Sequence, residues 1–132
     1  YERSKIKVAF NKSMIEKICG NFKGKVNIYH AIDEHNFAHA SVLTIEDNHT
    51  VYHLLSGRSN DAIRGANALI VYHTVKDTME KGKNYDFEGS SIPSIATFFR
   101  SFGSEVVTFN QVYKSRYRFT DVKIKPIFAN LK

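Results

Sequence analysis

A change of hydrophobic period near residue 60 constrains the fold more than any other feature of the sequence. Before it, three short segments rich in Val, Ile and Tyr are separated by polar turns at 34–36 and 47–49. This pattern is typical of antiparallel strands joined by short turns. After it, apolar residues recur at helical spacing, among them Val71, Val75 and Met79. The sequence therefore predicts a β-meander followed by a long helix that packs against it.

The same patterns place the other elements in the order α-β-β-β-α-β-α-β, with one more strand near the end. The predicted strands are 25–33, 37–46, 50–56, 84–88, 105–113 and 117–124. The predicted helices start at Ser13, near Asp61 and at Pro93, and they end at Gly20, Gly82 and Gly103. This order predicts an α+β fold with a mixed, mostly antiparallel sheet and helices on both of its faces.

Composition agrees with one globular domain of 132 residues. Hydrophobic residues make up 42% of the chain and charged residues 24%, a balance that excludes a disordered chain. Cys19 is the only cysteine, so no intrachain disulfide can form, and no apolar run is long enough for a membrane span. These features favour a cytoplasmic location.

The formal net charge is +6, with basic residues grouped near both ends of the chain. A basic surface attracts phosphate-rich partners such as nucleic acid, coenzymes or anionic lipid. The alternative is that these residues serve only solubility. No RNA-binding motif accompanies the charge, so the sequence supports an RNA-binding domain only weakly.

Two stretches together resemble a known family. Residues 54–58 (LLSGR) and 65–69 (GANAL) are similar to the strand-loop-helix centre of Fem-like domains in the GNAT superfamily of acyltransferases. Residues 85–90 (YDFEGS), 92–93 (IP) and 98–103 (FFRSFG) resemble the C-terminal signature of the same branch. The Fem-type enzymes form peptidoglycan bridges by aminoacyl transfer. The resemblance covers roughly residues 25–115.

The chain also departs from the family pattern. The coenzyme A loop of GNAT enzymes has Arg or Gln at its first position and Gly or Ala at its last, where this chain has Ala62 and Asn67. The resemblance therefore implies either acyl-CoA or aminoacyl-tRNA as the donor. It also implies a strand and helix before Ser13 that the sequence lacks. The chain is thus expected to be a single GNAT-like domain (residues 1–132) that is incomplete at its N-terminal edge, or the second half of a tandem protein. A second copy or a partner half-domain would complete it.

The segment 57–66 is the expected donor site. A helix N-terminus offers amide N–H groups and a favourable dipole to an anion, and Arg58 and Arg64 flank this one. Gly65 would let a ligand approach the backbone. The candidate donor-binding residues are Arg58, Arg64, Gly65, Ala66 and Asn67. The alternative is that Asp61 caps the helix and the arginines are only solvated.

Asp86 and Glu88 are the candidate catalytic residues. They alternate with aromatic residues on a predicted strand, which would direct both carboxylates to the same face. Amide formation needs a base that takes a proton from the amine, and a half-buried carboxylate with a raised pKa suits that role. Glu88 is the better candidate, because Asp86 is expected to cap the following turn or pair with Arg100.

The histidines do not predict a metal site. His39 and His53 are expected to face each other across adjacent strands, but no carboxylate or cysteine has the spacing of a further ligand. The leading interpretation is an N-acyltransferase that moves an acyl or aminoacyl group to an amine, such as a cell-wall precursor, with tRNA as a donor carrier. The alternative is a non-catalytic GNAT-like binding or assembly module.

Overall fold

The computed structural model describes residues 11–108, which belong to two compact units that divide after Glu88. The first unit contains a four-stranded sheet and two helices, and the second contains one helix. The strands are β1 (Val26–Ile32), β2 (Ala38–Glu46), β3 (Thr50–Arg58) and β4 (Asn84–Asp86). The helices are α1 (Lys12–Asn21), α2 (Ala66–Glu80) and α3 (Pro93–Arg100). The expected α+β class is confirmed.

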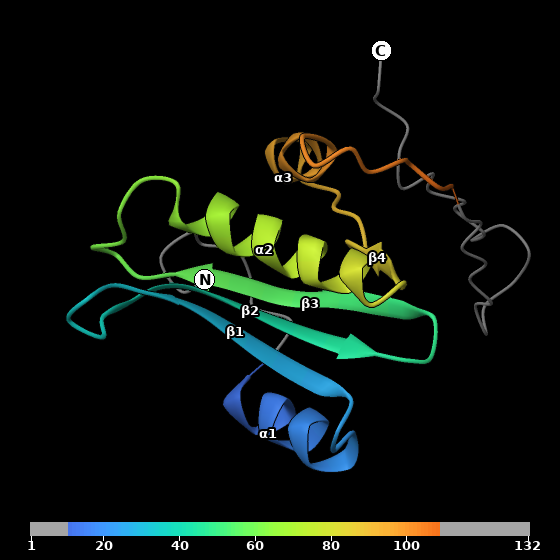
Figure 1. Ribbon diagram of the computed structural model, residues 1–132, viewed down its shortest axis with the longest axis horizontal. Coiled ribbons are helices and arrows are strands. Elements are labelled where there is room, and N and C mark those ends of the chain that lie inside the picture. Colours follow the sequence, from blue (N-terminus) through green and yellow to red (C-terminus); the bar gives the residue numbers. More distant parts are fainter. Residues whose placement is uncertain (1–10, 109–132) are drawn as a thin grey trace, which may run out of the picture. The chain divides into compact units, whose positions relative to one another are not determined.

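The strands are arranged in the order β1-β2-β3-β4 (Figure 1). β1, β2 and β3 form an antiparallel meander, and β4 runs parallel to β3 after the α2 crossover. The expected mixed, mostly antiparallel sheet is therefore present. The arrangement specific to GNAT enzymes and the single-domain assignment stay predictions. Of the two last predicted strands, residues 105–108 form no strand, and the remainder lies outside the described residues.

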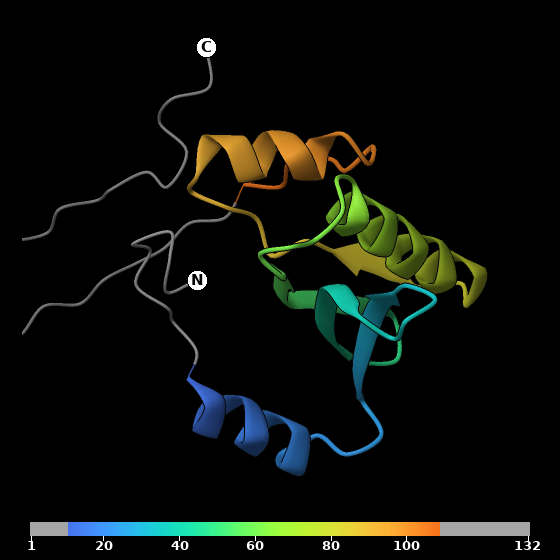
Figure 2. The same cartoon turned by 90° about the vertical axis from the view of Figure 1, so that its left-hand side faces the viewer.

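Helix α2 lies along one face of the sheet (Figures 1 and 2). The core consists of small and β-branched side chains from the sheet and the helix. Its buried members include Ala40, Val42, Thr44 and Val51 of the sheet and Ala66, Ile70, Val71, Thr74 and Thr78 of α2. Thr74 and Thr78 can be buried because their hydroxyls donate to backbone carbonyls four residues earlier, at 2.7 and 2.8 Å.

Three details of the helices differ from the sequence prediction. In α1, Asn11 is the N-cap and its side chain accepts from the Met14 N–H, so the predicted capping box at Ser13 is wrong. Gly20 lies inside α1 rather than at a left-handed cap. In α2, Met79 is exposed although it belongs to the predicted apolar stripe, because a stripe that includes Thr74 and Thr78 faces the sheet.

A partly buried hydrogen bond joins α2 to β1. The Tyr29 hydroxyl of β1 donates to Asp77 Oδ2 at 2.8 Å, and Lys81 Nζ contacts the same oxygen at 2.7 Å. Burial, together with the Asp77 carboxylate, raises the pKa of Tyr29, so the phenol stays a donor.

Tyr29→Phe is therefore expected to lower the free energy of unfolding by about 1 kcal/mol, because Asp77 loses one donor. Urea unfolding at neutral pH measures this difference. Tyr72→Phe removes a hydroxyl from an exposed tyrosine of α2 and serves as the control. Equal losses in the two variants would show that the Tyr29–Asp77 bond contributes nothing specific.

Candidate functional site

The parallel pair of β3 and β4 ends early. Its register joins Thr50 to Asn84, Val51 to Tyr85 and Tyr52 to Asp86, and β4 stops there. β3 continues to Arg58, paired on its other side with β2. Beyond Tyr52, the β4-facing edge of β3 therefore borders no strand in the described part of the chain. A strand edge without a partner strand has backbone N–H and C=O groups that can bind a ligand.

A β-bulge lies at the point where the pairing ends. Leu43 pairs with Leu55 and Thr44 with His53, which leaves Leu54 as the extra residue of β3. A bulge bends its strand and redirects the neighbouring backbone, and bulges are frequent beside active sites. The bulge therefore gives a local reason for β3 and β4 to part beyond Tyr52.

The loop before α2, residues 59–65, will be called the α2 entry loop. It ends at Gly65, the N-cap of α2, whose backbone is left-handed with φ of 92°. No side chain caps this helix, and its first turn holds no acidic residue. Asn67 lies in that first turn, and its Oδ1 atom is buried and accepts no hydrogen bond within the described residues. The helix therefore begins with amide groups that lack intrahelical acceptors.

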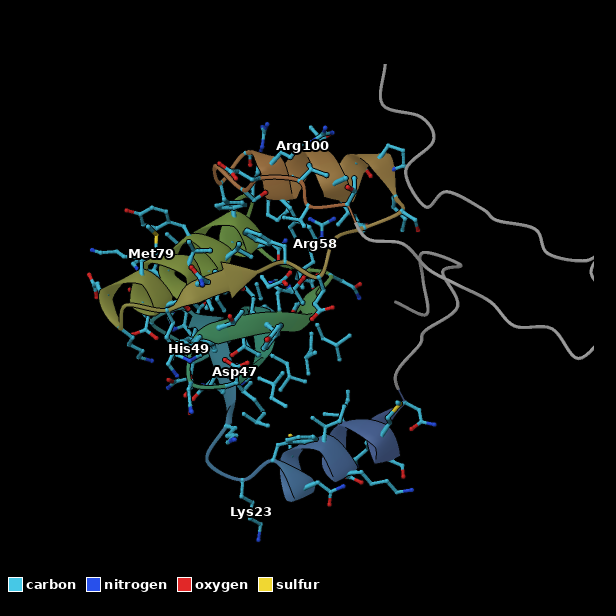
Figure 3. The ribbon with its side chains drawn as sticks, turned by 90° about the vertical axis from the view of Figure 1, so that its right-hand side faces the viewer. Lys23, Asp47, His49, Arg58, Met79 and Arg100 are labelled. Atoms are coloured by element: carbon cyan, nitrogen blue, oxygen red, sulfur yellow. The ribbon has the colours of Figure 1, made fainter. Side chains whose placement is uncertain are left out.

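The predicted donor-binding residues are brought to one end of β3. Arg58 is its last residue, at the opposite end of the strand from the turn that holds Asp47 and His49 (Figure 3). Arg64 lies in the α2 entry loop, and the side chains of both arginines are exposed. Asp61 is not the helix cap, because α2 starts five residues later than the sequence pattern indicates.

Asp86 is the last residue of the parallel pair, and Glu88 lies two residues beyond it. The Glu88 N–H donates to Asp86 Oδ1 at 2.7 Å, so Asp86 holds the turn that follows β4, as expected of a capping residue. The prediction that the two carboxylates alternate on one strand is wrong, since β4 ends at Asp86 and Glu88 has a left-handed backbone with φ of 58°. A residue with a Cβ atom is sterically strained in that conformation.

The Glu88 carboxyl has a perturbed acidity. Its side chain is exposed, yet neighbouring protein atoms remove part of its hydration, and Asp86 adds a second negative charge. Desolvation first and this repulsion second raise the pKa of Glu88. A carboxylate whose pKa is raised is a stronger base than an ordinary surface glutamate, which suits proton transfer from an amine.

Sequence reasoning missed an aromatic and histidine cluster at the same parallel pair. His53 is buried, and its Nδ1 atom lies 2.7 Å from the Tyr85 hydroxyl. Its ring stacks with Phe87 at a centroid distance of 6.1 Å. Burial lowers the pKa of His53 to about 4 and raises that of Tyr85, so at neutral pH a neutral phenol is hydrogen-bonded to a neutral imidazole. Only the β3–β4 register brings these residues together.

The predicted pairing of His39 with His53 is wrong. His53 is opposite Thr44, whereas His39 lies near the other end of β2, 3.2 Å from Asp33 Oδ2 through its Nε2 atom. No group of three His, Cys, Asp or Glu side chains suited to a metal ion occurs among residues 11–108.

The chemistry-bearing groups fall into two sets, one after each parallel strand. The set after β3 comprises the two arginines and the uncapped start of α2, and the set after β4 comprises Asp86 and Glu88. Ligands commonly bind at the carboxyl ends of parallel strands, where loops and helix N-termini meet. Comparison with known proteins gives no match, whether with family models, with curated proteins or with solved structures. No helix within residues 11–108 is long and apolar enough to cross a membrane.

Proposed function

We propose that the chain is a GNAT-like N-acyltransferase domain of the Fem type, which transfers an acyl or aminoacyl group from coenzyme A or tRNA to an amine. One observation carries the proposal: β3 and β4 are parallel neighbours whose pairing ends at Tyr52 and Asp86, beside a bulge at Leu54. This supplies a strand edge for the carbonyl of the donor. The resemblance of residues 85–103 to the Fem-like signature supplies the reaction class.

In the proposed reaction, the donor carbonyl lies along the β3 edge beyond Tyr52, where backbone N–H groups stabilise the developing oxyanion. The amine nitrogen attacks the carbonyl carbon, and Glu88 accepts a proton from that nitrogen. The bond from carbon to the sulfur of coenzyme A, or to the ribose oxygen of tRNA, then breaks. The leaving group takes up a proton, and an amide is formed.

The phosphate groups of the donor are assigned to the start of α2. Arg64 and Arg58 supply positive charge, and the uncapped first turn supplies N–H donors. Gly65 adds no side chain there, and a Cβ at this position would have open space but a strained backbone. Coenzyme A and tRNA both carry phosphate, so the same anion site would serve either donor.

The second candidate is a non-catalytic module with the same core. It is favoured by Ala62 and Asn67, which replace the residues expected in a coenzyme A loop. A thermal-shift series with acetyl-CoA, longer acyl-CoAs and alanyl-tRNA separates the two candidates. A true donor at about 100 times its Kd stabilises the fold by about 2.7 kcal/mol, a shift of several degrees. If no donor shifts the midpoint, the transferase is excluded and the non-catalytic module is the remaining candidate.

Arg64→Ala is expected to abolish the donor-induced shift and to leave the midpoint without donor nearly unchanged, because Arg64 is exposed. Lys23→Ala removes one positive charge from the exposed turn before β1 and is the matched control (Figure 3). It should retain the full shift. Retention of the full shift in Arg64→Ala would rule out this donor site.

A further inference from the structure

A buried histidine lies between the β1–β2 turn and the α2 entry loop. Ala31 pairs with Ala40 and Ile32 with Ala38, so His39 is the extra residue of a second bulge. A bulge redirects the side chain of the extra residue. The His39 ring is only 8% exposed, and it forms a T-shaped pair with the Phe37 ring at a centroid distance of 4.9 Å.

Both ring nitrogens of His39 have identified partners. The backbone N–H of Ile63 donates to Nδ1 at 3.2 Å, and Nε2 lies 3.2 Å from Asp33 Oδ2. An amide can only donate, so Nδ1 must be the unprotonated acceptor. In a neutral imidazole the proton is then on Nε2, which donates to Asp33. The hydrogen bonds therefore select one tautomer.

Asp33 is itself held as an acceptor. Its Oδ1 atom accepts the N–H groups of Phe37 and His35, each at 2.9 Å. The Phe37 N–H is the largest cause that lowers the pKa of Asp33. Desolvation, the second in size, opposes it, and the His35 N–H and the His39 ring lower the pKa further. Asp33 is thus a carboxylate at neutral pH, and a carboxylate accepts only. This fixes which ring nitrogen carries the proton.

His39 holds the α2 entry loop at two points. Its backbone carbonyl accepts from the Ser59 N–H at 2.9 Å, and its ring accepts from Ile63. The Ser59 hydroxyl also contacts the Ala38 carbonyl. The Ile63 side chain is 62% exposed, so burial of that side chain does not fix the loop. The His39–Ile63 bond therefore ties the loop to β2 immediately before Arg64 and Gly65, next to a local bond in which the Ala66 N–H donates to the Ile63 carbonyl at 3.3 Å.

We propose that His39 is the positioning residue of the α2 entry loop: it holds Ile63 so that Arg64 and Gly65 meet the phosphate of the donor, and Asp33 selects the tautomer that allows this. The donor part of this inference rests on the proposed function. The part that concerns the loop does not, because the hydrogen bonds exist without a ligand.

Two substitutions separate the two hydrogen bonds of the imidazole, because each keeps one and removes the other. In His39→Asn the amide oxygen lies close to the position of Nδ1, so it can still accept from Ile63 while the contact with Asp33 is lost. In His39→Gln the amide nitrogen reaches the position of Nε2, so it can still donate to Asp33 while Ile63 loses its acceptor. Both variants bury a neutral amide of similar polarity, so a general loss of packing would affect them alike.

The test is NMR on the full chain. In the wild type, a coupling across the hydrogen bond between the Ile63 and His39 Nδ1 nitrogens is expected. The Ile63 amide should exchange with solvent about 10-fold faster or more in His39→Gln and close to the wild-type rate in His39→Asn. An absent coupling, or equal exchange rates in the two variants, would overturn the role of His39 in the loop.

Binding separates this inference from the proposed function. With the donor that shifts the wild-type midpoint, His39→Gln should bind about 10-fold more weakly or worse, and His39→Asn should bind nearly as the wild type does. Equal binding by all three proteins would refute the role in donor binding and leave the transferase proposal intact. If no donor binds the wild type, both the transferase proposal and the effect of His39 on donor binding are refuted. The amide exchange of Ile63 still tests whether His39 holds the α2 entry loop.

Discussion

Lowering the pH from 7 to 4 is expected to destabilise the fold by about 3 kcal/mol through His53 alone. In the unfolded chain this imidazole titrates with an ordinary pKa of about 6.5. In the folded chain, burial lowers the pKa of His53 to about 4. The difference of about 2.5 pKa units, at 1.36 kcal/mol per unit, gives the expected loss.

The sign follows from proton binding. Between pH 6.5 and 4 the unfolded chain binds a proton at His53 that the folded chain does not bind, so acid favours unfolding in this range. The contribution of His53 is fully present above pH 6.5. It is lost progressively as the pH falls towards 4, where the folded imidazole also becomes protonated.

His53→Gln tests this expectation, because a neutral amide can still hydrogen-bond with the Tyr85 hydroxyl. Urea unfolding at several pH values between 7 and 4 should show a smaller pH dependence in His53→Gln than in the wild type, by about 3 kcal/mol. His73→Gln changes an exposed histidine of α2 and should retain the full dependence. An unchanged pH dependence in His53→Gln would mean that His53 is hydrated in the folded chain.

The second large effect is expected at Glu88. Glu88→Gln should lower the rate of acyl transfer by about 100-fold or more, because an amide of the same shape cannot accept the proton of the amine. The rate is measured in single turnovers with the donor that shifts the midpoint and a peptide that carries a free lysine amine. Glu34→Gln, which removes an exposed carboxylate from the β1–β2 turn, should leave the rate unchanged.

The pH profile gives an independent check on Glu88. Its pKa is raised, and a base must be unprotonated, so the wild-type rate should fall as the solution is acidified through that pKa. This limb should disappear in Glu88→Gln. Glu88→Gly should remove the activity without lowering stability, since glycine adopts a left-handed backbone freely. A Glu88→Gln enzyme with full activity would exclude Glu88 as the base.

Local patterns were enough to predict the meander. The three strands begin and end within two residues of their predicted bounds, because alternation and turn residues such as Asn36 act over short distances. The start of α2 was misplaced because residues 61–65 are held in a loop by His39, a contact that spans 24 positions. The spacing of apolar residues in the sequence contains no information about such a long-range contact.

The candidate site was predicted in part, for the same physical reason. Sequence patterns placed Arg58 and Gly65 in the segment between a strand and a helix N-terminus, and Arg58 ends β3 while Gly65 is the N-cap of α2. Asp86 was expected inside a strand and is instead the last residue of β4. They did not reveal the bulges at His39 and Leu54, each of which shifts the strand register by one residue. A bulge is stabilised by its tertiary surroundings, and its extra residue looks like any other strand residue in the sequence.

The central claim is that a donor binds where β3 and β4 part. Its most direct test is an amide NMR titration of the chain with the donor that raises the midpoint. The account predicts that the largest shifts occur at residues 54–58 on the uncovered edge of β3 and at residues 64–67 at the start of α2. Large shifts confined to the β1 side of the sheet or to α3, with none at these two segments, would contradict it.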